Sequence, residues 1–148
     1  MNTRDLVGAF LIYESELLLT EGPRGLWSGV GGIIAPDEIN SPIAACYREI
    51  EEKTGMTIDD IEMLELRYIT TQEKDGIIEV IYYYIGTLSD KTDIEDNTFH
   101  WMKTRDTRDL PMSVPIKSIL LHWLDNPKST DVHLCVIDQN ERVMWADL

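Results

Sequence analysis

The 26 residues from Gly31 to Met56 place a double glycine and a proline ahead of a run rich in carboxylates. Ser41 followed by Pro42 is typical of a helix N-terminus, and Gly55 is typical of the residue just past a helix end. The sequence therefore predicts a helix from about Pro42 to Thr54, preceded by a tight loop at the double glycine.

The predicted helix has two different faces on a wheel of about 100° per residue. One face carries charge and comprises Ala45, Arg48, Glu49, Glu52 and Lys53. A second face is an apolar stripe, expected to point into a core, and comprises Ile43, Cys46, Tyr47 and Ile50. Glu51 lies outside both faces, so we expect it in solvent.

The charged face suits a magnesium site. Glu49 and Glu52 lie on adjacent turns beside the double glycine, and Mg²⁺ prefers oxygen ligands while keeping several waters. A nucleoside diphosphate compound would complete the metal shell with its phosphates. The alternative is a solvated, salt-bridged helix face with no ligand at all.

The same stretch resembles the Nudix box, the signature of the Nudix (MutT-like) hydrolase family. The matching residues, in order, are Gly32, Glu38, Arg48, Glu49, Ile50, Glu52, Gly55 and Met56. The residues before them also resemble the approach loop of the family, namely Trp27, Gly29, the double glycine and Pro36. The resemblance implies one domain over residues 1–148 with a Nudix fold, an α+β or α/β/α sandwich whose mixed β-sheet is flanked by helices.

Three features depart from the signature. Nine residues, Ile39 to Tyr47, separate Glu38 from Arg48, two more than the signature has, so the loop or the first helical turn must be longer. Lys53 replaces the last glutamate of the box, and Ala35 occupies a position that is often glutamate. The metal site is therefore expected to have fewer acids than usual.

The family resemblance implies an activity. Nudix enzymes hydrolyse a diphosphate linked to a group X, with water attacking phosphorus and Mg²⁺ as cofactor, for which Mn²⁺ is a possible substitute. Glu49, Glu52 and the backbone carbonyl of Gly31 would be metal ligands, Arg48 would orient a glutamate, and Glu38 would be a supporting acid. The sequence leaves X open among a damaged nucleoside triphosphate, an ADP-ribose-like diphosphate and a dinucleotide polyphosphate.

Lys53 separates two functions. A unit cation about 4 Å from a dication, at an effective dielectric of about 20, is opposed by roughly 8 kcal/mol, so the ammonium and a metal cannot share the position. If the flexible lysine swings out, a weakened hydrolase remains, which is the outcome we favour. If it stays, it could hold a nucleotide phosphate as a point charge, giving a nucleotide-binding or regulatory module.

Other candidate residues are less tied to spacing. Arg24 and Arg67 could reach phosphate, and Trp27, Phe10 or Tyr13 could stack on a base, although surface or core roles remain open for each. General-base candidates are Glu79, Glu95 and Asp96. The histidines, His100, His122 and His133, lack metal-ligand spacing, so we expect them at the surface or the core edge.

Composition restricts the partners. The net charge is −14, with 13 basic against 27 acidic residues, which disfavours nucleic-acid polymers because their binding relies on Lys and Arg. A small-molecule nucleotide neutralised by magnesium remains suitable. Cys46 and Cys135 lack a metal or redox spacing, and no apolar stretch reaches transmembrane length, so we expect a cytoplasmic protein that does not bind membranes. A homodimer is left open.

The remaining sequence predicts strands and one more helix. Strand pairs are expected at Leu6–Tyr13 with Leu17–Glu21, at Glu65–Thr71 with Ile77–Gly86 around an Asp75-Gly76 turn, and at Val132–Ile137 with Arg142–Trp145. Phe99–Met102 is expected to form another strand. Ser113 and Pro115 open a predicted helix that runs through about Leu124.

Overall fold

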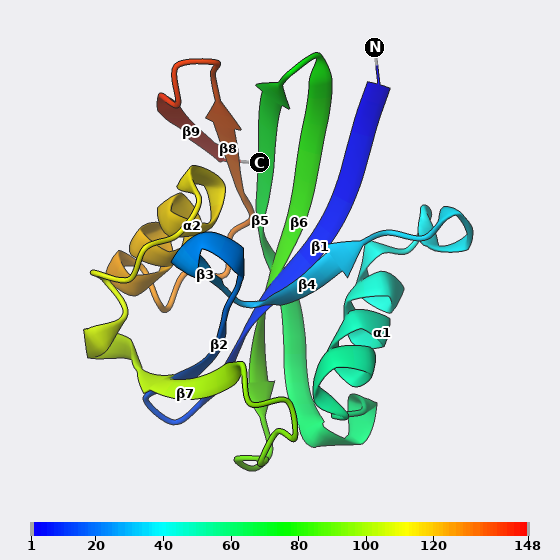
Figure 1. Ribbon diagram of the computed structural model, residues 1–148, viewed down its shortest axis with the longest axis vertical. Coiled ribbons are helices and arrows are strands. Elements are labelled where there is room, and N and C mark those ends of the chain that lie inside the picture. Colours follow the sequence, from blue (N-terminus) through cyan, green and yellow to red (C-terminus); the bar gives the residue numbers. More distant parts are fainter. Residues whose placement is uncertain (1, 148) are drawn as a thin grey trace.

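The computed structural model describes residues 2–147 and shows a mixed β-sheet with a helix on either side (Figure 1). The strands are β1 (Asn2–Tyr13), β2 (Glu16–Glu21), β3 (Trp27–Ser28), β4 (Val30–Ile33), β5 (Ile61–Lys74), β6 (Ile77–Leu88), β7 (Phe99–Lys103), β8 (His133–Ile137) and β9 (Val143–Asp147). The helices are α1 (Pro42–Thr54) and α2 (Val114–Asp125), with short 3₁₀ segments η1 (Pro23–Gly25), η2 (Pro36–Glu38), η3 (Ile58–Asp60) and η4 (Thr104–Asp106). The expected mixed sheet flanked by helices is confirmed.

Strand β1 organises the sheet because it pairs with three neighbours. Its last three residues, Leu11–Tyr13, pair antiparallel with β2, and its middle residues, Leu6–Ala9, pair antiparallel with β4. Along nearly its whole length β1 also pairs parallel with β6. The sheet therefore divides along β1, where β4 pairs with the middle of the strand and leads into α1, while β2 pairs with its end and continues to β7.

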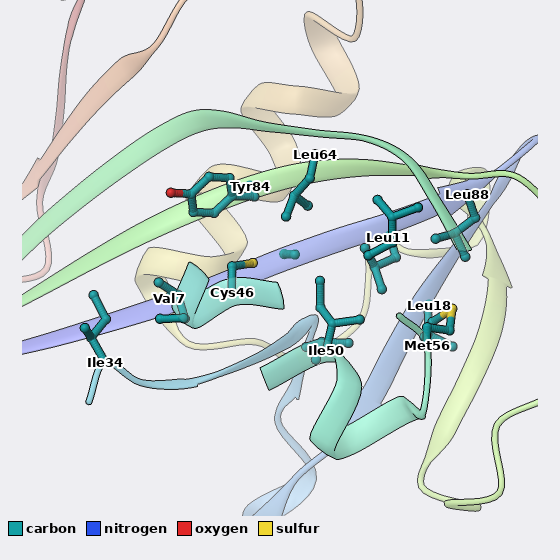
Figure 2. Packing of buried hydrophobic residues seen from close by; sticks show 14 residues of the cluster. Val7, Leu11, Leu18, Ile34, Cys46, Ile50, Met56, Leu64, Tyr84 and Leu88 are labelled. Atoms are coloured by element: carbon teal, nitrogen blue, oxygen red, sulfur yellow. The ribbon is translucent and has the colours of Figure 1, made fainter. Parts of the chain in front are cut away.

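Side chains alternate across this sheet and supply two cores. Ala9 and Leu11 of β1 point into the core under α1, whereas Phe10 points into the core under α2. Cys46 and Ile50 bring α1 onto the first core, where they lie among side chains from several strands (Figure 2). In the described part of the chain, no helix is long and apolar enough to cross a membrane.

Two local expectations are wrong. The double glycine is part of strand β4 rather than of a tight loop, and its residues pair with β1. Two glycines give no side-chain alternation, so the strand left no pattern in the sequence. Ile43 belongs to the predicted apolar stripe but is 40% exposed, because α1 covers the sheet with its later turns.

The other predicted elements are present with adjusted ends. Helix α1 has the predicted bounds, although Ser41 makes no side-chain capping hydrogen bond. The Asp75-Gly76 turn has positive φ at both residues, 54° and 78°, as a type I′ turn requires. Strand β5 is longer than predicted because register shifts between Ile61 and Met63 and between Leu66 and Tyr68 interrupt its alternation.

Candidate active site

Arg48 on α1 gathers three carboxylates. Its Nε and Nη2 donate to the two oxygens of Glu38 at 2.7 and 2.8 Å. Its Nη1 donates to Glu49 Oε1 at 3.0 Å and to Glu52 Oε2 at 3.1 Å, and Nη2 also reaches the Ile33 carbonyl oxygen at 3.1 Å. One planar guanidinium thus fixes the acids of η2 and α1 in relation to the end of β4.

Glu38 reaches Arg48 from the segment η2, so the two extra residues lie in the loop before α1 and not in the helix. Glu38 Oε1 also accepts a hydrogen bond from the Ala35 backbone N–H at 3.0 Å. The hydrogen bonds from Arg48 lower the pKa of Glu38, and those to Glu38 raise the pKa of Arg48. Both groups therefore carry full charge at neutral pH.

Lys53 stands between two oxygen atoms that the family resemblance assigns to a metal. Its Nζ donates to the Gly31 carbonyl oxygen and lies 3.1 Å from Glu49 Oε2. Glu49 is buried, and within residues 2–147 its Oε2 accepts no hydrogen bond. The ammonium occupies the position of a cation held by one carboxylate and one carbonyl.

These donors fit a hard divalent cation. Glu49 Oε2, a buried carboxylate oxygen whose charged partner is the Lys53 ammonium, is a suitable metal ligand, and a backbone carbonyl is a suitable second ligand. Glu52 is held by Arg48, and its side chain is 58% exposed. Across residues 2–147, no group of three or more His, Cys, Asp and Glu side chains is arranged to hold a metal. A metal at this site would therefore depend on fewer side chains and on the Gly31 backbone carbonyl. A metal requires Lys53 to leave, which its 45% exposed side chain allows.

The two glycines of β4 let the strand approach both α1 and β1. A Cβ on Gly32 would overlap the Glu49 carboxylate, whereas a Cβ on Gly31 would overlap the Val7 carbonyl oxygen. Neither glycine has positive φ. The two glycines therefore let the β4 backbone lie close to β1 and to α1, which brings the Gly31 carbonyl to the buried Glu49.

A cavity of about 280 Å³ adjoins this site. Gly31, Gly32 and Lys53 form part of its wall, and further lining residues come from β1, β2, β3, β4, β6, β7 and α2. Tyr83 of β6 and the hydroxyl residues Thr20 and Ser28 also line it. Sequence reasoning missed Tyr83, because the run of tyrosines at 82–84 gives no sign of which ring meets a cavity.

The predicted substrate-binding residues lie in different places. Trp27 begins β3 and packs against His100, with ring centroids 5.6 Å apart. Arg24 is exposed in η1 and has a positive φ of 65°. Arg67 on β5 pairs with Glu65 and reaches the Thr130 carbonyl oxygen at 3.5 Å, so the structure does not bring it to the Arg48 cluster. Lys53 is the fourth predicted substrate-binding residue, and it alone of the four lines the cavity.

The histidines and two of the base-stacking candidates belong to packing. His122 and His133 contact each other and Tyr68 in an aromatic cluster between α2 and β8. Tyr68 donates to or accepts from His122 Nδ1 at 2.9 Å. Phe10 is fully buried under α2, and Tyr13 packs at the edge of the core under α1.

The three general-base candidates are separated by the fold. Glu95 and Asp96 line a groove that also includes Glu52 and Lys53. Asp96 accepts hydrogen bonds from the Thr98 backbone and hydroxyl, the first of which is the main cause of its lowered pKa. Glu79 lines a different cavity, beside the start of α2.

The fold matches solved structures over nearly its whole length. MutT protein from Bacillus halodurans has a TM-score of 0.70 at 20% identity, with 97% of each chain covered. Ap4A hydrolase from C. elegans has a TM-score of 0.67 at 19% identity, covering 87% of this chain and 100% of that one. The NUDIX domain of Shewanella oneidensis NrtR, complexed with ADP ribose, has a TM-score of 0.70 at 18% identity, covering 86% and 90%.

Sequence comparison identifies the family. No curated protein matches the chain. The family model of the NUDIX domain matches residues 2–128, which include the Arg48 cluster, Lys53 and all but the last strands of the sheet. With its box on α1 and its fold shared with MutT, this chain belongs to the Nudix family.

Proposed function

We propose that this chain hydrolyses a nucleoside diphosphate linked to another group, with Mg²⁺, at a weakened metal site on α1. The observation that carries the proposal is the convergence of Glu49 Oε2 and the Gly31 carbonyl oxygen on one cation, the Lys53 ammonium. These two oxygens already hold one positive charge, and both are of the ligand types that Mg²⁺ takes. The Arg48 contacts hold Glu52 beside it as a further donor.

The roles of the residues follow from their contacts. The metal would be held by Glu49, Glu52 and the Gly31 carbonyl. Arg48 positions both of these glutamates, and Glu38 neutralises the charge of Arg48. When bound, Mg²⁺ would supply charge neutralisation for the leaving diphosphate and a more acidic water. Glu95 is our candidate to accept the proton of that water, because it borders the groove beside Glu52 and, unlike Asp96, is not engaged by Thr98.

The ligand class is a small nucleotide. The Ap4A hydrolase and the ADP-ribose complex among the similar structures support this class without fixing the group X. The net charge of −14 also favours a ligand that arrives with a metal ion over a polyanion.

A second candidate function is a nucleotide-binding module without turnover. It is favoured by the same lysine, since Lys53 already satisfies Glu49 and the Gly31 carbonyl and would leave no room for Mg²⁺. In that case the ammonium would bind a phosphate directly, and binding would need no metal.

The deciding experiment is a hydrolysis screen with Mg²⁺ over nucleoside triphosphates, ADP-ribose and dinucleotide polyphosphates. We expect turnover of at least one class, and we expect Glu52→Gln to lower it by at least about 10–100-fold, the loss typical even of outer-shell partners. Glu51→Gln is the matched control, because Glu51 is the exposed neighbour on the same helix. Unchanged turnover in Glu52→Gln would mean that the metal site lies elsewhere.

A further inference from the structure

Tyr83 is a buried phenol at the wall of the cavity beside Lys53. Its side chain is 2% exposed, and its ring packs against Phe10 with centroids 4.8 Å apart. The hydroxyl oxygen accepts a hydrogen bond from the Gly29 backbone N–H at 3.1 Å. Tyr83 and Gly29 both line the cavity, so this hydrogen bond joins two residues of its wall.

The proton of this hydroxyl is unused. In the part of the chain that the structure describes, no oxygen or nitrogen atom accepts a hydrogen bond from Tyr83, whose hydroxyl only accepts. The other two hydroxyls of the cavity do donate, Thr20 to Thr98 Oγ1 at 3.1 Å and Ser28 to the Gly29 carbonyl at 3.1 Å. Burial raises the pKa of Tyr83, so the phenol keeps its proton at neutral pH. A buried donor without an acceptor costs free energy unless a ligand or water supplies one.

The cavity itself describes what could supply that acceptor. Half of its lining residues are aliphatic or aromatic, four more are glycines, and among the lining residues described Lys53 is the one charged side chain. A volume of about 280 Å³ is just below the roughly 300–1,000 Å³ of sites that enclose a drug-sized ligand, so it suits one ring system. A charged group would lose its hydration there without a partner, except at the Lys53 end.

We propose that Tyr83 is a specificity-determining residue, whose hydroxyl donates a hydrogen bond to a ring acceptor of a nucleobase seated in this cavity. The phosphates of the same nucleotide lie at Lys53 and Gly31, and any second charged group of the substrate lies outside the cavity. This inference rests on the proposed function for the location of the phosphates. It concerns ligand selection and is independent of whether the diphosphate is cleaved.

The test is calorimetric binding of ligands that cannot be hydrolysed. The probes are the methylene analogues, with CH₂ in place of the bridging oxygen, of ADP, GDP, UDP, CDP and benzyl diphosphate, together with methylenediphosphonate itself. Wild-type protein should bind at least one nucleoside analogue about fivefold more tightly than the benzyl analogue, the effect of about one hydrogen bond. Tyr83→Phe should abolish that advantage and leave methylenediphosphonate binding unchanged.

Tyr84→Phe is the matched control. Tyr84 is the next residue of β6, is also buried, at 4% exposed, and points into the opposite core under α1 (Figure 2). It should retain the nucleoside advantage in full.

Several outcomes overturn the inference. Retention of the nucleoside advantage in Tyr83→Phe would do so, and an equal loss of methylenediphosphonate binding would assign Tyr83 a structural role. If Tyr83→Phe does not fold, the wild-type protein still tests the inference. Equal binding of the nucleoside and benzyl analogues by the wild type would rule out a hydrogen bond between Tyr83 and a ring acceptor. Selective binding without any turnover of the natural diphosphates would refute the hydrolase proposal while leaving this inference intact.

Discussion

Lys53 holds the position between Glu49 Oε2 and the Gly31 carbonyl where the family resemblance places a metal ion. The Lys53 ammonium thus takes the position expected for a bound metal ion. Its contacts also explain how a buried glutamate without a hydrogen bond on Oε2 is tolerated, since an ion pair 3.1 Å away offsets part of the desolvation of the carboxylate.

Replacing this cation should reveal the metal site. Lys53→Glu removes the competing charge and adds a carboxylate, so we expect Mg²⁺ to bind at least about tenfold more tightly in a calorimetric titration, with a rise in turnover. Lys53→Met is the matched control, because it removes the ammonium without adding a ligand and should give an intermediate affinity. Sub-micromolar Mg²⁺ affinity in the wild type would contradict the weakened site.

The same variants separate the two candidate functions. A binding module should bind nucleotide without Mg²⁺ and lose that binding in Lys53→Glu, whereas a hydrolase should gain activity. If the wild type turns over none of the screened substrates and Lys53→Glu gains nothing, the enzyme assignment should be abandoned and the family kept.

Strand β4 shows how two residues without side chains can set a site. Gly31 and Gly32 are adjacent, yet they face different neighbours, one the backbone of β1 and the other the carboxylate of Glu49. Close approach on both faces is what leaves the Gly31 carbonyl within reach of α1.

The two glycines should therefore respond differently to substitution by alanine. Gly31→Ala forces the backbone of Val7 and Gly8 to move, so we expect a loss of about 1–3 kcal/mol in urea unfolding. The atoms nearest to a Cβ on Gly32 belong to the end of the Glu49 side chain, so the unfolding free energy of Gly32→Ala should fall less while Mg²⁺ affinity drops about tenfold or more. Equal stability losses in both variants, with metal affinity kept, would show that Gly32 only spaces the strand.

The whole molecule is a sheet with an apolar core on each face, and each core depends on one helix. Ile50 brings α1 to the sheet and Leu120 brings α2, and both are fully buried. Ile43 lies on the same helix as Ile50 but is exposed.

Stability should follow that division. Ile50→Ala and Leu120→Ala should each lower the free energy of unfolding by about 2–5 kcal/mol, because each leaves a cavity in a packed core. Ile43→Ala, the control on α1, should cost less than about 1 kcal/mol. A large loss in Ile43→Ala, measured by the same urea unfolding, would mean that this residue is covered in solution.

Much of the fold was determined by local sequence signals. Pro42 and Gly55 delimit α1 because proline and glycine restrict or permit backbone angles within single residues. Asp75-Gly76 fixes the β5–β6 turn for the same reason. The charged face of α1 is also readable from the sequence, because residues three and four positions apart share a helix face by geometry alone. The family resemblance follows from the order of the same charged residues.

The site was decided by contacts between segments far apart in the chain. That Gly31 and Gly32 form a strand, that Lys53 reaches back to the Gly31 carbonyl, and that Tyr83 meets Gly29 all depend on β1 pairing with β4 and β6 together. No residue type encodes such a meeting by itself, because burial and hydrogen-bond partners are set only when the sheet closes around them. The sequence by itself therefore determined which residues were candidates to hold a cation, and the tertiary structure placed the Lys53 ammonium against two of them and decided what cavity lies beside it.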